Sequence, residues 1–218
     1  VGVLAENDSL DIPKEFYTSQ TIDPKTDLFQ SYNGQPSRID FYGNSEWHYQ
    51  GHLHREGGPA SISKEGQEKW YRYGKLHRED GSAVTDPNGL KEWWLNGVNW
   101  RPEDLPSSIT SDGSKIWKNK EGLAHRDGDL PAKIDSRGSK YWYQNGVIHR
   151  EKGPARIIVD ESGKSQVWSK NGRVHREGDL PAVIQSDGTE EWLSNGNRHR
   201  EGDLPALVGP DRQEWYQN

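Results

Sequence analysis

Six His-Arg dipeptides recur along the chain, and their side chains are the strongest candidates for binding chemistry. They are His54-Arg55, His77-Arg78, His125-Arg126, His149-Arg150, His175-Arg176 and His199-Arg200. Imidazole nitrogens bind metal ions such as zinc, and planar guanidinium groups suit carboxylates and phosphates. Which of these chemistries is available depends on how far apart the fold places the dipeptides.

The dipeptides belong to a sequence repeat that is marked by tryptophan. Trp returns every 23 to 26 residues, at Trp47, Trp70, Trp93, Trp117, Trp142, Trp168, Trp192 and Trp215. Around these positions the chain reads P-A-x-I, a turn containing Gly, and then W-x-x-N-G-x-x-H-R-E. Self-similarity at a fixed period is the signature of a repeat architecture. We predict about eight β-hairpin repeats over residues 32–218 and an N-terminal arm or cap over residues 1–31, with Thr18 to Asp27 as a loop.

The Asn-Gly pairs set the register of one hairpin in each repeat. Asn-Gly suits a two-residue type I′ turn, in which both central residues need positive φ. With Asn145-Gly146 in the turn, Trp142 lies opposite His149. The same arithmetic pairs Trp47 with His54, Trp70 with His77, Trp168 with His175 and Trp192 with His199. We interpret these pairs as a structural Trp–His ladder.

A second turn separates the P-A-x-I segment from the Trp. Ala132 precedes Trp142 by ten residues, and the same spacing holds in other repeats. A three-residue loop with Gly in the left-handed region would place that Ala opposite that Trp. Period-two alternation adds Ile62, Ile134 and Ile184 to the same face. The sequence therefore predicts a core face of Ala, Ile, Trp and His.

The repeat spacing argues against a metal site. Equivalent histidines of adjacent repeats should lie about 10 Å apart, because each repeat adds two strands, whereas zinc ligands lie about 2 Å from the metal. His48, His52 and His54 form the one local cluster, and we expect no metal there.

The arginines leave two interpretations open. Each Arg should alternate to the face opposite its His, and an acidic residue follows it. The first interpretation is a solvated charge ladder with Arg lying over Trp or Tyr rings. The second is an anion-recognising stripe for an extended acidic partner. Trp94 and Trp100 are extra rings in an irregular repeat where Trp100 replaces the His. The candidate binding residues are Arg55, Arg78, Trp94, Trp100, Arg126, Arg150, Arg176 and Arg200.

Composition excludes several function classes. The chain has 218 residues, a net charge of −6 and no Cys, which removes disulfides and thiol nucleophiles. The negative charge gives no general attraction to nucleic acid, and no apolar run reaches the length of a membrane span. No signal peptide or catalytic motif is evident. We therefore expect a soluble, virion-associated or cytoplasmic protein without enzyme activity, cofactor or metal.

The phrase W-x-x-N-G-x-x-H-R-E-x-G-P-A resembles MORN-type repeats. It is most similar to a variant found in bacterial antitoxin-type proteins and in large DNA viruses and phages, and the resemblance covers roughly residues 32–218. It departs from the standard pattern, in which the Trp-to-His spacing is one residue shorter and Gly follows the His. The resemblance implies stacked β-hairpins and a role in interaction or scaffolding, with no shared catalytic site.

These observations favour an all-β fold, an elongated stack of antiparallel hairpins that forms a ribbon or solenoid. The leading functional hypothesis is a module for protein–protein interaction or scaffolding, such as a virion or phage component. One alternative is an antitoxin or immunity protein that binds a toxin. Another is a surface module that binds carbohydrate or choline through its Trp rings.

Overall fold

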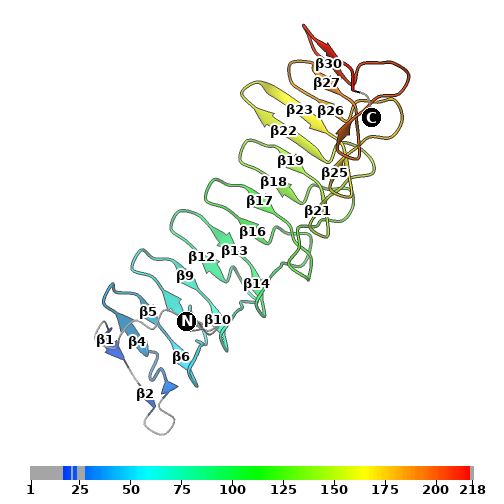
Figure 1. The fold of residues 1–218 in the computed structure, drawn as a ribbon. Helices are drawn as coiled ribbons and strands as arrows, with labels where there is room; N and C mark the ends of the chain where they lie inside the picture. Colours follow the sequence, from blue (N-terminus) through cyan, green and yellow to red (C-terminus); the bar gives the residue numbers. More distant parts are fainter. Residues whose placement is uncertain (1–16, 21, 24–27, 217–218) are drawn as a thin grey trace, which may run out of the picture. The chain divides into compact units, whose positions relative to one another are not determined.

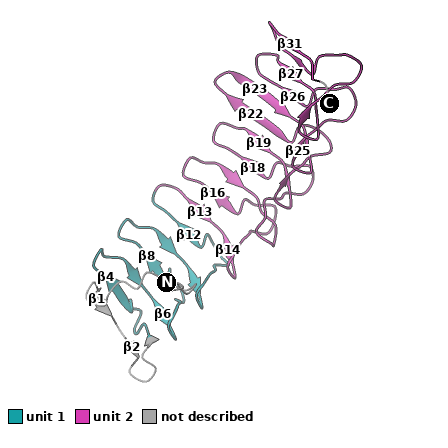
Figure 2. Cartoon of the chain, in the orientation of Figure 1, with its two compact units in different colours: residues 1–87 teal, residues 88–218 magenta. Residues whose placement is uncertain are grey.

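The computed structural model describes residues 17–20, 22–23 and 28–216. These residues form strands and turns, and they contain no helix. Accordingly, no helix in this part of the chain is long and apolar enough to cross a membrane. The chain divides into two compact units, residues 1–87 and residues 88–218 (Figure 2).

Unit 1 contains one antiparallel sheet and three separate two-stranded hairpins. The sheet runs in the order β1, β4, β5, β8, β9, β12, and the hairpins are β2–β3, β6–β7 and β10–β11. The strands are β1 Tyr17–Gln20, β2 Ile22–Asp23, β3 Leu28–Phe29, β4 Arg38–Asp40, β5 Ser45–Glu46, β6 His48–Tyr49, β7 His52–Leu53, β8 Ser61–Ile62, β9 Glu68–Lys69, β10 Tyr71–Arg72, β11 Lys75–Leu76 and β12 Val84–Thr85.

Unit 2 repeats the same plan, with its sheet strands lying side by side in sequence order (Figure 1). The sheet strands are β13 Lys91–Glu92, β16 Ser108–Ile109, β17 Lys115–Ile116, β18 Lys133–Ile134, β19 Lys140–Tyr141, β22 Arg156–Asp160, β23 Gly163–Val167, β26 Val183–Ile184, β27 Glu190–Glu191, β30 Leu207–Val208 and β31 Gln213–Glu214. The hairpin strands are β14 Trp94–Leu95, β15 Val98–Asn99, β20 Tyr143–Gln144, β21 Val147–Ile148, β24 Ser169–Lys170, β25 Arg173–Val174, β28 Leu193–Ser194 and β29 Asn197–Arg198. The predicted all-β stack of antiparallel hairpins is confirmed within each unit.

The two-residue turns adopt the predicted conformation and register. Asn145 and Gly146 have φ of 48° and 83°, the positive values that a type I′ turn requires. Tyr143 pairs with Ile148 across this turn, and the amide of His149 donates to the carbonyl of Trp142 at 3.1 Å. The same His-to-Trp amide bond forms in the repeats of Trp47, Trp70, Trp168 and Trp192.

The three-residue turns also follow the expected geometry. Gly138 has φ of 87°, and Lys133 pairs with Tyr141 across that turn, which places Ala132 opposite Trp142. The amide of Trp142 in turn donates to the carbonyl of Ala155, on the next strand of the sheet, at 2.8 Å. Trp and Ala therefore alternate along the stack.

The buried core includes fewer of the repeat positions than the sequence pattern predicts. Ala132 is fully buried, and Trp142 is 6% exposed. Ile62, Ile134 and Ile184, however, are only half-buried. Small hydroxyl side chains fill part of the interior instead, and Ser139 is 1% exposed. The Ile prediction failed because these two-residue strands end at the Ile, beside an exposed turn.

The described part of the N-terminal arm is not a simple loop. β1 pairs antiparallel with β4, and β2 pairs with β3, so the loop predicted over Thr18 to Asp27 contains strand residues. Past β3, the amide of Ser31 donates to the carbonyl of His48 at 2.9 Å. The arm therefore contributes a sheet strand and also runs beside the first small hairpin.

Candidate functional site

Each repeat places the Arg of its His-Arg dipeptide over its own Trp ring. The guanidinium carbon lies 3.8 to 4.0 Å from the ring centroid. The pairs are Arg55 on Trp47, Arg78 on Trp70, Arg126 on Trp117, Arg150 on Trp142, Arg176 on Trp168 and Arg200 on Trp192. The prediction that Arg points away from the Trp–His face is wrong, because the strand ends before the His and period-two alternation stops there.

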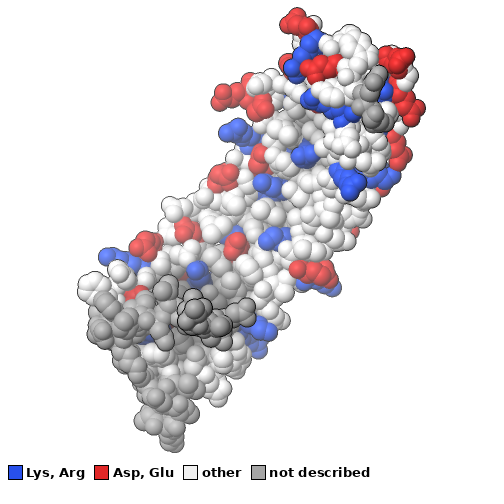
Figure 3. Space-filling model, in the orientation of Figure 1, with Lys and Arg blue, Asp and Glu red and all other residues white. Residues whose placement is uncertain are grey.

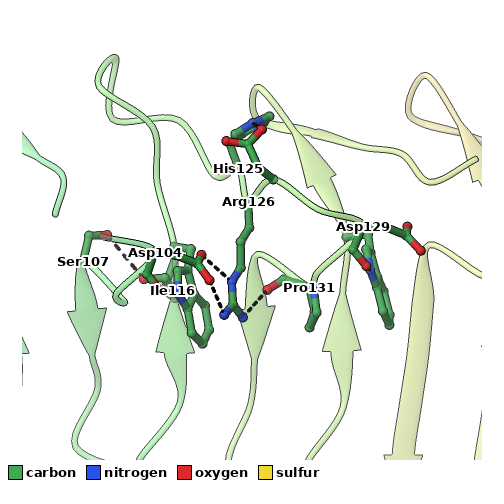
Figure 4. Close-up of polar contacts among 10 residues, drawn as sticks. Asp104, Ser107, Ile116, His125, Arg126, Asp129 and Pro131 are labelled. Carbon is green, nitrogen blue, oxygen red and sulfur yellow. Dashed lines mark hydrogen bonds and ion pairs between the residues drawn. The ribbon is translucent and has the colours of Figure 1, made fainter. Parts of the chain in front are cut away.

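Three of these arginines bind a carboxylate of the preceding repeat through two parallel hydrogen bonds. Arg126 Nε and Nη2 donate to Asp104 at 2.7 and 2.9 Å, and Figure 4 shows the guanidinium reaching Pro131 as well. Arg150 donates in the same way to Asp129, and Arg200 to Asp179. Paired N–H bonds to a carboxylate are the strong form of this interaction.

Sequence reasoning missed these aspartates. It noted only the acidic residue directly after each Arg, whereas the bonded Asp lies 21 or 22 residues earlier in the chain. The sequence did contain a signal for these aspartates, because the loop that follows the Arg occurs in two lengths. In long loops the third residue after the Arg is Asp and begins Asp-Leu-Pro, whereas in short loops that residue is Gly.

The same Asp can also fix the Trp of the next repeat. The carbonyls of Asp104 and Asp129 accept the indole N–H of Trp117 and Trp142 at 3.0 and 2.9 Å. Both aspartates have positive φ. Asp179 differs, because the buried Trp192 indole N–H that follows it has no partner among the described residues. The long loop therefore links repeats through the Asp side chain in three cases. It links them through the Asp carbonyl in three cases as well, because Asp203 accepts the indole N–H of Trp215.

These ion pairs lower the pKa of the aspartates. The hydrogen bonds from Arg126 and Arg150 hold the pKa of Asp104 and Asp129 below the ordinary value, and the positive charge of each Arg adds to this effect. The Arg side chains are 15% and 17% exposed, so both pairs are partly shielded from water.

Two of the six arginines have no carboxylate partner among the described residues. Arg55 and Arg176 each donate Nη1 to the carbonyl of a proline in their own repeat, at 3.2 and 3.0 Å. Arg78 instead pairs with Asp80 of its own loop at 2.9 Å. The predicted stripe is therefore uneven, since some arginines are neutralised within the chain and others are not.

The ladder histidines join neighbouring repeats. His149 Nδ1 accepts the amide of Asn171 in the next turn at 3.1 Å, which requires the proton to be on Nε2. His149 Nε2 lies 3.0 Å from the carboxylate of Glu151. His54, His125 and His175 accept a turn amide in the same way.

The local histidine cluster has no metal-binding geometry. No group of three or more His, Cys, Asp or Glu residues that could hold a metal occurs among the described residues. His48 is 7% exposed, and its Nδ1 lies 2.7 Å from the hydroxyl of Ser37. Burial lowers the pKa of His48 to about 4, and the charges of Arg38 and His52 act in the same direction.

In the regular repeats the backbone amide of the His donates to the Trp carbonyl. In the irregular repeat the side-chain amide of Asn99 makes the equivalent bond. The side chain of Asn99 is buried and donates to the carbonyls of Trp93 and Ser107 at 2.9 and 3.1 Å. Trp94 donates its indole N–H to Glu92 at 3.0 Å, while Lys120 lies 5.6 Å from the ring of Trp100. Asn99 was not predicted as a structural residue, because nothing in its spacing marked it.

Consecutive His-Arg loops of unit 2 enclose a row of four grooves. Their volumes are about 310, 280, 570 and 380 Å³ in chain order, and each groove takes its lining from two neighbouring repeats. Trp100 lines the first groove, whereas Trp94 lines none of the four. Leu105, Leu130 and Leu180 of the long loops line the first, second and fourth grooves and are 40% to 48% exposed.

On the face of unit 2 that Figure 3 shows, charge is mixed rather than gathered in one patch. Figure 3 shows Lys and Arg interspersed with Asp and Glu over this unit. Three of the grooves thus combine an exposed leucine with Trp and charges of both signs, whereas the third has Trp and charges without a leucine. No family model and no curated protein matches the sequence.

Proposed function

We propose that this chain is a non-enzymatic repeat module that binds a protein partner or builds an assembly. The observation that carries the proposal is the row of similar grooves along unit 2, each lined by a Trp, an Arg and a His from successive repeats. A periodic row of shallow sites suits an extended macromolecule better than a small substrate. Repeat arrays commonly bind partners along such surfaces.

The groove edges supply the kind of side chain that protein interfaces use. Leu105, Leu130 and Leu180 are large apolar side chains held at 40% to 48% exposure by rigid Asp-Leu-Pro loops. An apolar anchor surrounded by charged and polar groups resembles the core and rim of a protein interface.

The carbohydrate and choline alternative is less well supported. Binding of that kind needs accessible aromatic faces. In six repeats a guanidinium already lies 3.8 to 4.0 Å from the Trp ring centroid. A sugar or quaternary ammonium group would have to displace that Arg.

An antitoxin or immunity role is the second candidate, because it uses the same protein-binding surface. The resemblance to antitoxin-type repeats favours it, and a virion or phage assembly role would place the same surface in a larger structure. Gene neighbours separate the two, since an adjacent toxin gene points to the former and capsid or tail genes to the latter.

The first experiment is a mild affinity purification of the full chain from its native source, with mass spectrometry of the co-eluting proteins. The Leu130→Ser/Leu180→Ser variant should lose a stoichiometric partner. Val147→Ser is the matched control, because Val147 is 44% exposed but lines none of the four grooves. A chain that co-elutes with no protein, while glycan or choline resin retains it, would contradict the proposal.

A further inference from the structure

The third groove of unit 2 differs from its neighbours in the charge that it leaves unpaired. It is lined by Arg150, Glu151, Lys152, Gly153, Pro154, Trp168, Ser169, Lys170, His175, Arg176 and Glu177. Four Lys and Arg residues thus face two Glu residues. The first groove also has four Lys and Arg residues, but three carboxylates accompany them. The third groove is also the largest of the four, at about 570 Å³.

Arg176 is the cation that this groove leaves without a carboxylate. It lies over the ring of Trp168 at 3.8 Å and donates Nη1 to the carbonyl of Pro181. Its remaining N–H groups have no hydrogen-bond partner among the described residues. Glu190 acts on Arg176 through its charge, without an ion pair between them, and Glu177 pairs with Lys170 at 2.6 Å.

The reason for the missing partner is the short loop of the preceding repeat. In the long loops the third residue after the Arg is an Asp, and this Asp binds the Arg of the next repeat. After Arg150 the third residue is Gly153. A Cβ at Gly153 would lie 3.1 Å from Arg150 Nη1, so a larger residue here would require the Arg150 side chain to shift.

The other repeats show which group fits such a groove. In three of them a carboxylate accepts two hydrogen bonds of 2.7 to 2.9 Å from an Arg that is stacked on Trp in the same way. Arg55 also lacks a carboxylate partner among the described residues, but the Arg176 groove adds Lys152 to the unpaired guanidinium, while its Lys170 is paired with Glu177. A second carboxylate, from outside the chain, can take the position that Asp129 takes beside Arg150.

We propose that the Arg176 groove is a carboxylate-binding site, which receives an Asp or Glu side chain of a protein partner. The proposal rests on the function inferred above and makes it specific. The partner's carboxylate accepts the two N–H bonds from Arg176, and Lys152 adds positive charge at the rim. The internal Asp–Arg pairs of the stack thus provide the geometry for an intermolecular one.

A peptide titration tests the site without the natural partner. The probe is acetyl-Gly-Asp-Leu-Pro-Ala-amide, which copies residues 128–132, and the control probe has Asn in place of Asp. With the full chain labelled with ¹⁵N, we expect the Arg176 Nε–H and Trp168 indole N–H resonances to shift with the Asp peptide. The Asn peptide should bind about tenfold more weakly, because it offers no charged acceptor.

Matched variants and a second anion identify the contact. Arg176→Lys should abolish the shift at Trp168, and the Arg150 Nε–H resonance should not move, since Asp129 already occupies that Arg. Equal shifts with the Asp and Asn peptides, or shifts centred on Arg150, would overturn the proposal. A response to inorganic phosphate without any response to the Asp peptide would also overturn it.

Completing the loop provides an independent test. Replacing Lys152-Gly153-Pro154 by Gly-Asp-Leu-Pro, the sequence of residues 128–131, should let the chain pair Arg176 internally. We expect a higher Tm than for the same loop built with Asn, and loss of the peptide-induced shift. An Asp loop that melts no higher than the Asn loop and leaves peptide binding intact would overturn the proposal.

These outcomes are separable from the fate of the proposed function. If a partner co-purifies but Arg176→Lys retains it fully, the carboxylate site is wrong and the interaction function stands. If the peptide binds at Arg176 but no protein co-purifies, the interaction function fails and the partner assigned to this site fails with it.

Discussion

The second groove, which is lined by Trp142 and Arg150, and the third groove, which is lined by Trp168 and Arg176, are built from equivalent strands and turns. They differ in charge balance. In both, a guanidinium lies 3.8 or 3.9 Å from a Trp ring and donates to a Pro carbonyl. Arg150 adds two hydrogen bonds to Asp129, whereas Arg176 has no such partner. The difference comes from one residue of loop length in the repeat before it.

This comparison separates what stabilises a repeat from what a repeat offers to a partner. The Trp–Arg contact occurs in both grooves and belongs to the architecture. The carboxylate is the variable part, because it comes from the loop and not from a strand. Insertions in surface loops cost little stability, so loop length can change the charge of a groove without disturbing the stack.

The largest effect should come from removing the ring under each Arg. Trp142 is 6% exposed, and Trp142→Ala should cost about 3–5 kcal/mol of unfolding free energy. Trp168 is half-buried, so Trp168→Ala should cost less. Urea unfolding of the two variants measures the difference. Equal losses would show that the burial of the Trp does not determine how much it stabilises its groove.

The second-largest loss of stability should come from removing the negative charge of Asp129. Asp129→Asn keeps the backbone carbonyl that Trp142 uses but removes the charge, and we expect a loss of about 1 kcal/mol because the pair is only partly buried. A double-mutant cycle with Arg150→Lys should show coupling. The same cycle between Lys152 and Arg176 should show none, and coupling there would remove the contrast between the grooves.

Lowering the pH should remove the stability that the Asp129–Arg150 ion pair contributes. Because Arg150 lowers the pKa of Asp129, the stability from this pair is present above the unfolded pKa of about 3.9 and is lost as the pH falls through the folded value. The difference between the wild type and Asp129→Asn should therefore be constant near neutral pH and shrink below about pH 4. Urea unfolding over that range tests this, and a difference that grows in acid would contradict it.

The smallest loss of stability should come from replacing a ladder histidine, and it should be the same in both grooves. His149 of the second groove and His175 of the third accept turn amides at 3.1 and 3.4 Å, and each His→Phe variant should cost about 0.5 kcal/mol. Similar losses in thermal unfolding would confine the contrast to the Arg–Asp link. A loss that is several times larger for one variant would show that the grooves also differ at their turns.

The fold was largely predictable from the sequence because its turns are local. Asn145-Gly146 alone specifies that Trp142 faces His149, since two positive φ values in a two-residue turn leave one register. The burial of Ile134 was not predictable in the same way. Burial depends on where a two-residue strand ends, and alternation does not encode that end.

The site was only partly predictable because its contacts cross between repeats. The recurrence of Arg and its stacking on aromatic rings, as one of two interpretations, came from the sequence, but the face of the Arg was predicted wrongly. Asp129 reaches Arg150 only after two repeats have stacked. The acidic residue next to Arg150 in the sequence, Glu151, lies beside His149. Comparing the two loop types position by position would have pointed to Asp129.

Several bonds between repeats run in the same direction along the chain. Arg150 and the amide of Asn171 each donate to a group of the repeat before them, and Ser114 and Ser139 accept backbone amides from the repeat that follows. At these contacts a repeat donates to the repeat before it and accepts from the repeat after it. A duplicated repeat would therefore fit between its parents with its bonds satisfied. Copying a long or a short loop would decide whether the lengthened protein gained a neutral groove or a cationic one.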